Sequence, residues 1–475
     1  MVTTGRTYDA VVVGSGPNGL AAAITLAQAG TSVVVLEAMD RFGGGMRSAE
    51  LTLPGYTHDI CSAIHPLLAG SPFFDGIDLE THGMKMIHPE VPFAHPLDGG
   101  RAVLLHRSVD ETAAALGPDA AAYRRLLTPL VGDFSRLQGE LLGPLRVPRH
   151  PLSMARFGRH ALEPVTRLVR RFETQDAAAL FGGMASHTML PLDAAMTGGF
   201  AVFFALLGHA VGWPMARGGS QAIADAMASY LRLSGGEIVT SSPVRSFRDI
   251  PQARCVLFDL SARQVLDIAG DRLSARFQSQ LRNFRYGPGV FKLDWALSEP
   301  IPWSAPDVAR AGTVHIVGTI PEAAESEAAV NAGRHPEKPF VLLAQQTRFD
   351  PTRAPRGRHT AWAYCHVPAG STVDMTQAIE AQLERFAPGF RDIVLAKHAL
   401  GPAQLEAENA NYVGGDIGAG VVDLRQSFTR PSRRWNPYTT SARDIYICSA
   451  STPPGPGVHG MGGYLAARSA LKRSL

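Results

Sequence analysis

The chain has 475 residues, of which 45% are hydrophobic and 18% charged, so it is long enough to bury the cores of two or more globular domains. Its formal net charge of +3 is close to neutral and gives no reason to expect nucleic acid as a partner. The four cysteines, Cys61, Cys255, Cys365 and Cys448, lie far apart, which excludes a neighbouring redox pair and any metal-ligand spacing.

The first predicted elements form a β-α-β unit at the N-terminus. Tyr8–Val13 is predicted as a buried strand because its valines are apolar and β-branched, and residues 32–37 form a second strand after an Ala/Leu-rich helix. Between them, a G-x-G-x-x-G run provides a tight turn, a close backbone approach to a pyrophosphate and close helix packing. The helix N-terminus favours phosphate, and the acid that ends the second strand suits a ribose diol. The unit predicts a dinucleotide site at Gly14, Ser15, Gly16, Pro17, Asn18, Gly19 and Glu37.

A second glycine cluster, in FGGGMRS, decides between NAD and FAD. It gives another close backbone approach to the pyrophosphate, and the arginines on either side offset the phosphate charge. The run resembles the E-x-x-x-R-x-G-G-x-x-x-S pattern of FAD enzymes in the amine-oxidase and phytoene-desaturase superfamily; solvated surface arginines are the alternative. The resemblance adds Arg41, Gly43, Gly44 and Arg47 to the expected FAD contacts.

The middle of the chain departs from simple β-α-β alternation. Residues 102–105 are strand-like, and residues 119–141 are predicted to be helical. Residues 146–171 contain seven arginines against one glutamate, interleaved with Leu, Met, Phe and Val. This composition suits peripheral contact with an anionic membrane surface, and a solvated basic face is the alternative.

An uncharged stretch at residues 194–216 is long enough to span a bilayer. Its four glycines, together with His209 and Pro214, indicate instead a core segment or the wall of an apolar pocket, with a membrane-dipping segment as the alternative. Such a pocket favours a hydrophobic substrate, although core packing explains the same residues equally well. They are Phe200, Phe203, Phe204, Leu206 and Leu207.

A second helix–strand pair follows. Ser220 is predicted to cap a helix over residues 222–233, which two glycines end. Residues 237–240 are predicted as a strand, and Val244 as the beginning of the next one. The pair could extend the nucleotide-binding sheet, and the domain would then be discontinuous in sequence.

The last predicted elements are a strand over residues 444–448 and a helix from about Gly462, joined by PPGPGVHGMGG. Glycines just before a helix place backbone N–H groups and a positive dipole end against their neighbour. In a flavoenzyme this suits the N1/C2=O edge of the isoalloxazine, and a terminal packing role is the alternative. The expected contacts are Ser451, Gly457, Val458 and His459.

These blocks together resemble the phytoene desaturase-like FAD-dependent oxidoreductases, in particular a branch named for a pyridine nucleotide-disulphide oxidoreductase domain. The likeness extends through GYTHDICSAIHP, GHAVGWPMARGGSQAIADA, YGPGVFKLDWAL, NYVGGDIGAG and CSASTPPGPGVHGMGGY. It implies non-covalent FAD, adenine contacts from the backbone of Val244 (a core valine is the alternative), and oxidation, desaturation or isomerisation of an apolar or polyene-like substrate. It also implies an α/β fold with a discontinuous Rossmann-type FAD-binding domain (1–70, 215–290 and 415–475) and a mixed α+β substrate domain (71–214 and 291–414).

Two departures limit the resemblance. Carotenoid desaturases usually read G-A-G-T-H-P-G-A-G-I-P-G near the C-terminus, whereas here Ser449, Ser451 and Pro453 replace the matching glycines and histidine, and His459 replaces a proline. Carotene itself is therefore not the expected substrate. Only one complete dinucleotide fingerprint exists, because GDIGAGVVD at residues 415–423 lacks a flanking strand and helix. Without a second nucleotide site or a cysteine pair, NAD(P)H-driven disulphide reduction is not expected.

Histidines supply the candidate catalytic groups. Flavin dehydrogenation needs a C–H bond held over N5, exclusion of water and sometimes a base. His58 and His65, from GYTHDICSAIHP, and His459, from the C-terminal loop, could provide that base. For His58 and Asp59, hydrogen bonds that only fix the loop are the alternative.

The sequence thus predicts an FAD-dependent dehydrogenase or desaturase that passes a hydride from a small hydrophobic, isoprenoid or lipid-like substrate to flavin N5 and on to oxygen or a quinone. A reduced-flavin polyene isomerase and a non-catalytic flavoprotein interaction module are the alternatives. No signal-like segment precedes the first strand, so a cytoplasmic location is expected, peripheral to the inner face of the membrane if residues 146–171 bind it. No metal is expected, and a homodimer stays open.

Overall fold

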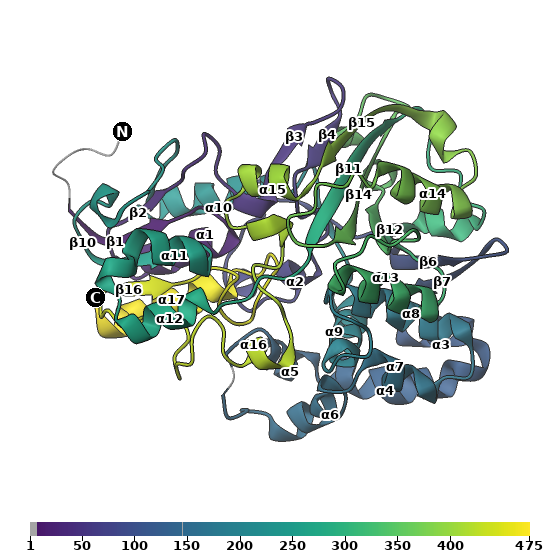
Figure 1. The fold of residues 1–475 in the computed structure, drawn as a ribbon, viewed down its shortest axis with the longest axis horizontal. Helices are drawn as coiled ribbons and strands as arrows, with labels where there is room; N and C mark the ends of the chain where they lie inside the picture. The colour runs from purple at the N-terminus through teal and green to yellow at the C-terminus, as the bar shows by residue number, and fades with distance from the viewer. Residues whose placement is uncertain (1–6, 145) are drawn as a thin grey trace.

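Two β-sheets and a layer of helices organise residues 7–144 and 146–475, the part of the chain that the computed structural model describes (Figure 1). The first sheet is entirely parallel, in the order β16-β10-β1-β2-β9. Its central strands are rich in valine because both of their faces are buried. The strands are β1 (Tyr8–Val13), β2 (Val33–Leu36), β9 (Glu237–Val239), β10 (Ala253–Phe258) and β16 (Ile445–Ile447).

Helices cover both faces of this sheet, which confirms the predicted α/β class. On one side lie α1 (Pro17–Gln28), α10 (Gln221–Leu233) and α17 (Met461–Arg473), and on the other α11 (Ala262–Ala269) and α12 (Ala275–Arg282). Successive side chains of a strand alternate between the faces, so Val12 joins the core with α1 while Val11 and Val13 join the core with α11.

The second sheet has seven strands in the order β15-β11-β14-β13-β12-β6-β7 and is antiparallel except where β12 pairs with β6. One face packs on α14 (Thr376–Phe386) through a wholly apolar core. The strands are β6 (Val91–Leu97), β7 (Arg101–Leu105), β11 (Gly289–Leu297), β12 (Ala311–Ile316), β13 (Val341–Ala344), β14 (His359–Val367) and β15 (Val394–Leu400).

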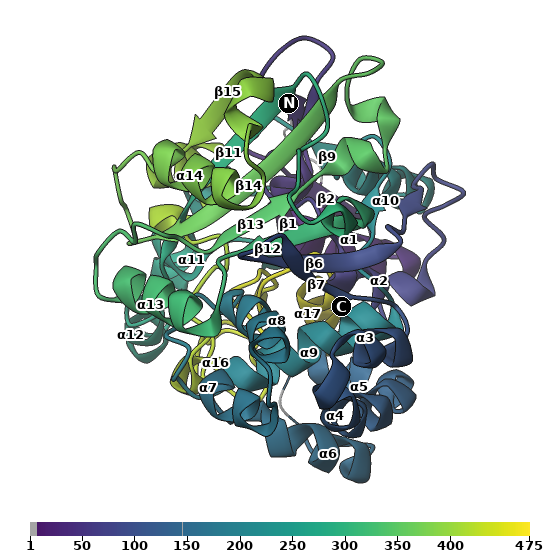
Figure 2. The ribbon, with the colours of Figure 1, turned by 90° about the vertical axis from the view of Figure 1, so that its right-hand side faces the viewer.

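Helices gather below the other face of the second sheet (Figure 2). They are α3 (Val109–Ala115), α4 (Ala120–Gly132), α5 (Phe134–Leu141), α6 (Pro151–Ala161), α7 (Val165–Leu168), α8 (Gln175–Ser186) and α9 (Thr197–Ala210). The predicted helix over 119–141 is broken at Asp133 into α4 and α5. The uncharged stretch forms α9, which packs against α4, α6, α7 and α8 as a core helix. In the described part of the chain, no helix combines the length and apolar character that crossing a membrane requires.

The remaining elements complete the fold, and among them α13 packs against α8. They are β3 (Ser48–Glu50), β4 (Thr57–Asp59), α2 (Pro66–Ala69), β5 (Met86–Ile87), β8 (Met215–Ala216), α13 (Ile320–Asn331), α15 (Pro402–Glu408) and α16 (Leu424–Ser427).

Two local predictions need correction. Ser220 is the N-cap residue of α10 as predicted, but its side chain makes no cap hydrogen bond; its hydroxyl donates to the carbonyl oxygen of Ser62 at 2.6 Å, and the Gln221 N–H donates to Ser48 Oγ at 3.1 Å. Val244 does not begin a strand, because the chain after β9 runs irregularly until β10. The first sheet draws its strands from three separate stretches of sequence, whereas the division of the chain into two domains stays a prediction.

Candidate cofactor and substrate site

A cavity of about 460 Å³ runs from the glycine turn after β1 to the inner face of the second sheet. Its walls come from segments far apart in the sequence, so the fold, rather than any one motif, creates it. The main contributors are residues 13–18, 36–39, 41–47, 61–67, 187–189, 242–244, 259–261, 407–412, 416–422 and 449–458, in whole or in part.

The predicted ribose acid lies at the turn end of this cavity. The Glu37 carboxylate accepts hydrogen bonds from the backbone N–H groups of Ser15 at 3.0 Å and Met39 at 2.9 Å. These contacts anchor the carboxylate while Glu37, 9% exposed, still lines the cavity. An anchored acceptor beside a glycine turn suits a ribose diol.

The two glycine clusters meet at the next position along the wall. A Cβ atom on Gly44 would lie 2.8 Å from the Cα of Gly16, and Gly44 has a φ of +55°, so both the contact and the backbone require glycine. Gly19 does not line the cavity; a Cβ there would lie 2.1 Å from the carbonyl oxygen of Gly14, which confirms its packing role. Gly43 lies behind the wall, against α10.

Both predicted arginines line the cavity. Arg47 is 5% exposed and donates from Nε to the carbonyl oxygen of Gly44 at 3.1 Å and from Nη2 to the carbonyl oxygen of Glu408 at 2.6 Å. Arg41 is exposed and donates to the carbonyl oxygen of Ser48 at 3.0 Å. The surface-charge alternative is therefore wrong for Arg47, which is held in the wall.

Sequence reasoning missed Asp259, which ends β10 beside the glycine turn. Its Oδ2 accepts a hydrogen bond from the Gly19 N–H at 2.8 Å and would lie 2.6 Å from a Cβ on Gly16. Burial raises the pKa of Asp259 to about 7. The available signal in the sequence was an acidic residue directly after a buried strand. Only the pairing of β10 with β1 shows that this residue lies beside the glycine turn.

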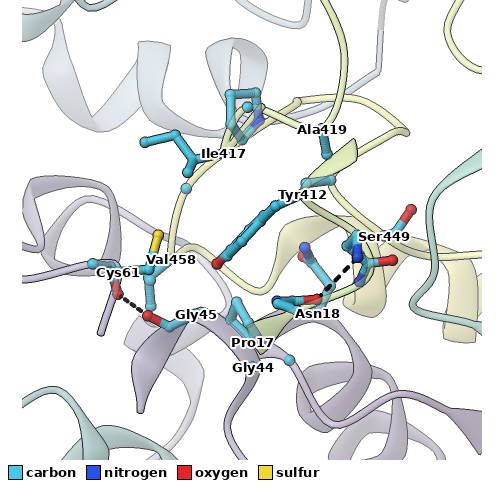
Figure 3. Close-up of a pocket in the computed structure, with 18 of the residues that line it drawn as sticks. Pro17, Asn18, Gly44, Gly45, Cys61, Tyr412, Ile417, Ala419, Ser449 and Val458 are labelled. Atoms are coloured by element: carbon cyan, nitrogen blue, oxygen red, sulfur yellow. Dashed lines mark hydrogen bonds between the residues drawn. The ribbon is translucent and has the colours of Figure 1, made fainter. Parts of the chain in front are cut away.

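The sequence also did not predict that residues 407–422 line the cavity, although part of this segment contributes to the family resemblance. Asn411 ties it to the turn, because its side chain accepts from Ser261 N at 2.7 Å and donates to the Asp259 carbonyl oxygen at 3.0 Å. From the same segment, Tyr412 reaches toward Gly45 and Cys61 (Figure 3), and a Cβ on Gly45 would lie 2.5 Å from the tyrosine oxygen. Burial raises the pKa of the Cys61 thiol, which keeps it protonated and unreactive.

Of the three candidate catalytic histidines, His65 lines the cavity. Its Nε2 lies 2.9 Å from Ser220 Oγ, whose own proton is donated to the Ser62 carbonyl oxygen, so Nε2 is the donor. Its Nδ1 is then a bare acceptor, with no partner among the described residues. Burial lowers the pKa of His65 to about 4, so the ring is neutral at neutral pH.

The other two histidines lie behind the wall. His58 is fully buried against Thr52 Oγ1 at 2.8 Å, and the neighbouring Asp59 pairs with Arg353 at 2.7 Å, as the loop-fixing alternative expects. His459 accepts the Met461 N–H at 3.0 Å and donates to the Gly455 carbonyl oxygen at 3.1 Å, so the backbone occupies both ring nitrogens. A catalytic role for any of the three stays a prediction.

Of the remaining expected cofactor contacts, some line the cavity and one lies behind its wall. Gly457 and Val458 line the cavity from the C-terminal loop, and Val244 lines it from the irregular segment after β9. Ser451 does not line the cavity; it is fully buried and donates to the Ala419 carbonyl oxygen at 3.2 Å.

The far end of the cavity is aromatic. Of the five predicted pocket residues, Phe204 lines it, whereas Leu206 and Leu207 are core residues. Trp213, from the segment predicted to form a pocket wall, also lines it, and around it stand side chains that periodicity could not place: His187, Thr313, Leu342, Trp362 and Tyr364. Three of the strands of the second sheet, β12, β13 and β14, supply the last four.

The described residues fit FAD. A glycine cradle with no room for a Cβ atom, an anchored ribose acceptor and a buried arginine line one continuous cavity whose far end is aromatic. Among the described residues, the four cysteines are free, and no cluster of potential metal ligands occurs.

Known proteins with similar sequences and folds identify the family of this chain. Residues 18–273 match the family described as flavin containing amine oxidoreductase. Pyridine nucleotide-disulfide oxidoreductase domain-containing protein 2 of Rattus norvegicus is 25% identical over 97% of this chain and 92% of its own length. Hydroxyneurosporene desaturase of Cereibacter sphaeroides is 35% identical over 29% of this chain and 32% of its own. The crystal structure of an oxidoreductase from Methanosarcina mazei superposes with a TM-score of 0.65 at 16% identity, covering 98% of this chain and 100% of that one. The chain therefore belongs to the flavin-containing amine oxidoreductase family, and it is an FAD-dependent oxidoreductase.

Proposed function

We propose that the protein is a dehydrogenase or desaturase of a small hydrophobic, isoprenoid or lipid-like substrate, with oxygen or a quinone as electron acceptor. The observation that carries this proposal is the continuity of the glycine-lined and aromatic parts of one cavity. A substrate held by Phe204, Trp213 and Leu342 would present its C–H bonds toward the glycine clusters. Similarity to a desaturase over part of the chain supports the reaction class.

The cofactor contacts are part of the proposal. When bound, the flavin would accept a hydride. The glycine turn and the N-terminus of α1 would approach the pyrophosphate closely, Glu37 would accept from a ribose, and Arg47 would place positive charge near the phosphates. Val244, Gly457 and Val458 would close the wall.

His65 is the side chain proposed to assist proton removal from the substrate. Its bare Nδ1 can accept a proton, whereas its low pKa makes it a weak base. We therefore propose hydride abstraction as the demanding step, because an apolar C–H bond offers no acidic proton.

Anaerobic bleaching tests the proposal. Purified holoprotein is expected to lose its flavin absorbance when incubated without oxygen with members of a panel of isoprenoids, fatty alcohols and aromatic hydrocarbons, and to regain it with oxygen or a quinone. If bleaching needs an external reductant, and isomerised product then forms, the isomerase alternative takes its place. Protein that holds flavin but bleaches with no compound contradicts the dehydrogenase proposal.

Peripheral contact with the inner face of a membrane is a further part of the proposal, through residues 146–171. Three of the seven arginines pair with acids, Arg146 with Glu140, Arg156 with Asp133 and Arg171 with Glu163. Exposed apolar side chains lie among the others: Val147 is 83% exposed, Leu152 79% and Leu162 53%. Basic and apolar groups on one surface suit an anionic bilayer. A homodimer stays a prediction.

Vesicle binding tests this contact. The protein is expected to sediment with phosphatidylcholine vesicles only when they contain phosphatidylglycerol, and Leu152→Asp is expected to weaken binding about tenfold because it removes an apolar contact and adds repulsion. Leu233→Asp is the matched control, since Leu233 is 81% exposed on α10. Equal loss in both variants, or no binding by the unaltered protein, would contradict the proposal.

A further inference from the structure

The two faces of the second sheet differ in chemistry. The face toward α14 carries Val314, Leu343 and Ala363, all fully buried in an apolar core. The face toward the cavity carries polar side chains at the alternate positions. His315, Leu342 and Tyr364 are cross-strand neighbours in one row, so their side chains share that face. Polar groups on a buried face need partners.

Tyr364 has a hydroxyl without such a partner. The hydroxyls of Tyr123, Tyr438 and Tyr446 lie 2.7 Å from His209 Nε2, 3.1 Å from the Pro453 carbonyl oxygen and 2.8 Å from Ser474 Oγ. Among the described residues, the hydroxyl of Tyr364 makes no such contact, although the residue is 7% exposed and lines the cavity. Because this hydroxyl is not among the enclosed unpaired atoms, it is open to the cavity, where a ligand or water can satisfy it.

His187 brings a second polar atom to the same end. Its Nε2 lies 2.9 Å from Nε2 of His315, so one ring must donate to the other. Nδ1 of His315 is buried against α8 without a partner, and a buried N–H without a partner is rarer than a bare acceptor. His315 therefore carries its proton on Nε2 and donates to His187, which leaves the proton of neutral His187 on Nδ1. Burial lowers the pKa values of both rings, which keeps them neutral.

A chain of aromatic contacts links the two groups. The ring centroids of His187 and Phe340 lie 6.2 Å apart, those of Phe340 and His366 5.3 Å, and those of His366 and Tyr364 5.7 Å. Thr313 Oγ1 and Trp362 Nε1, which belong to residues of the same wall, also have no partner among the described residues, although both atoms are enclosed by the protein.

We infer that the aromatic end of the cavity binds an oxygen acceptor, a carbonyl or hydroxyl group, on an otherwise apolar substrate, with the N–H of His187 and the hydroxyl of Tyr364 as donors. A substrate of pure hydrocarbon would leave both donors unsatisfied and lose affinity. The inference rests on the proposed function and narrows its substrate class to oxygenated hydrophobic molecules.

A pair of probes of equal shape tests it. Equilibrium dialysis of the holoenzyme would compare 2-acetonaphthone with 2-isopropenylnaphthalene, in which a methylene group replaces the carbonyl oxygen. The ketone is expected to bind about tenfold more tightly, because its oxygen accepts hydrogen bonds from the site, whereas the methylene analogue leaves the same donors without a partner. Tyr364→Phe and His187→Phe are each expected to reduce that ratio, and the double variant to bring it to one or below, with hydrocarbon affinity retained.

Tyr230→Phe is the matched control, because the hydroxyl of Tyr230 contacts Gln28 at the surface and the residue does not line the cavity. This variant should keep the wild-type ratio of ketone affinity to hydrocarbon affinity. A ratio of one in the unaltered protein, or a preference that survives the double variant, overturns the inference and shows that water alone satisfies these groups. The measurement needs no turnover, so it fails or succeeds independently of the bleaching experiment.

Discussion

Asp259 lies at the end of the cavity where the cofactor is expected to bind. Its carboxyl accepts from the Gly19 N–H at the same turn that would receive a pyrophosphate. Burial is the largest cause of its raised pKa, about 7, and the neighbouring Glu37 adds to it. A bound diphosphate would add negative charge and favour the protonated carboxyl further. Cofactor affinity and the ionisation of Asp259 are therefore linked.

This linkage gives a prediction for Asp259→Asn. The affinity of apoprotein for FAD is expected to fall about tenfold as the pH rises through about 7, because the carboxyl then becomes an anion beside the phosphates. The asparagine variant keeps an acceptor for Gly19 N–H without the charge, so its affinity should be nearly independent of pH. Titration with FAD at pH values on both sides of 7 measures the effect. Parallel pH profiles for the two proteins would refute the linkage.

Between elements, the contact of α1 with α17 joins the two ends of the sequence. A Cβ on Gly463 would lie 1.8 Å from the carbonyl oxygen of Asn18, and one on Gly462 would lie 2.8 Å from that of Cys448. Since these atoms belong to the backbone, they cannot move aside as a side chain could. The glycines therefore set the distance at which α17 holds the C-terminal loop against the glycine turn.

Gly463→Ala is predicted to separate these helices. Overpacking against a backbone should cost about 3 kcal/mol and release flavin, because both walls of the cavity shift. Urea unfolding and the absorbance of retained flavin would show both effects. Gly158→Ala is the control, because a Cβ there meets nothing within 4 Å on α6, and the change should stabilise by about 0.5–1 kcal/mol. Similar stability in both variants would contradict the close-contact argument.

Local motifs predicted those parts of the site whose partners lie nearby in the sequence. Glu37 and Arg47 were predicted because the β-α-β unit and the second glycine cluster place them within one supersecondary structure. Asp259 and Asn411 were missed because they reach the turn only through the pairing of β10 with β1 and the folding of a distant loop. The cap hydrogen bond expected of Ser220 does not form, because its hydroxyl donates to the carbonyl oxygen of Ser62 instead.

Across the whole molecule, burial of neutral histidines sets the response to acid. Among the described residues, desolvation lowers the pKa of ten of them below the ordinary value of 6.5. It is lowered to about 4 for His58, His65, His95, His209 and His459, and to about 3 for His187. These histidines lie around both sheets, so their low pKa values affect the stability of the whole fold.

The predicted consequence is a loss of stability as the pH falls from about 6.5 to about 4. In that window the unfolded chain binds protons that the folded chain excludes, so the free energy of unfolding decreases with falling pH, by about 1.4 kcal/mol per pH unit for each histidine fully in the window. Calorimetric scans of the holoprotein at pH 7 and pH 5 would measure it. A melting temperature unchanged between these two values would disprove the prediction.

The fold's dependence on a strand and loop from near residue 450 also bears on synthesis. While a ribosome is still translating the middle of the chain, the outer edge of β10 has no β16 to pair with, and the pocket lacks the wall built by residues 449–458. A nascent chain of that length exposes an unpaired strand edge, which is prone to aggregate. Flavin uptake therefore follows translation, and any shortage of cofactor acts on finished molecules.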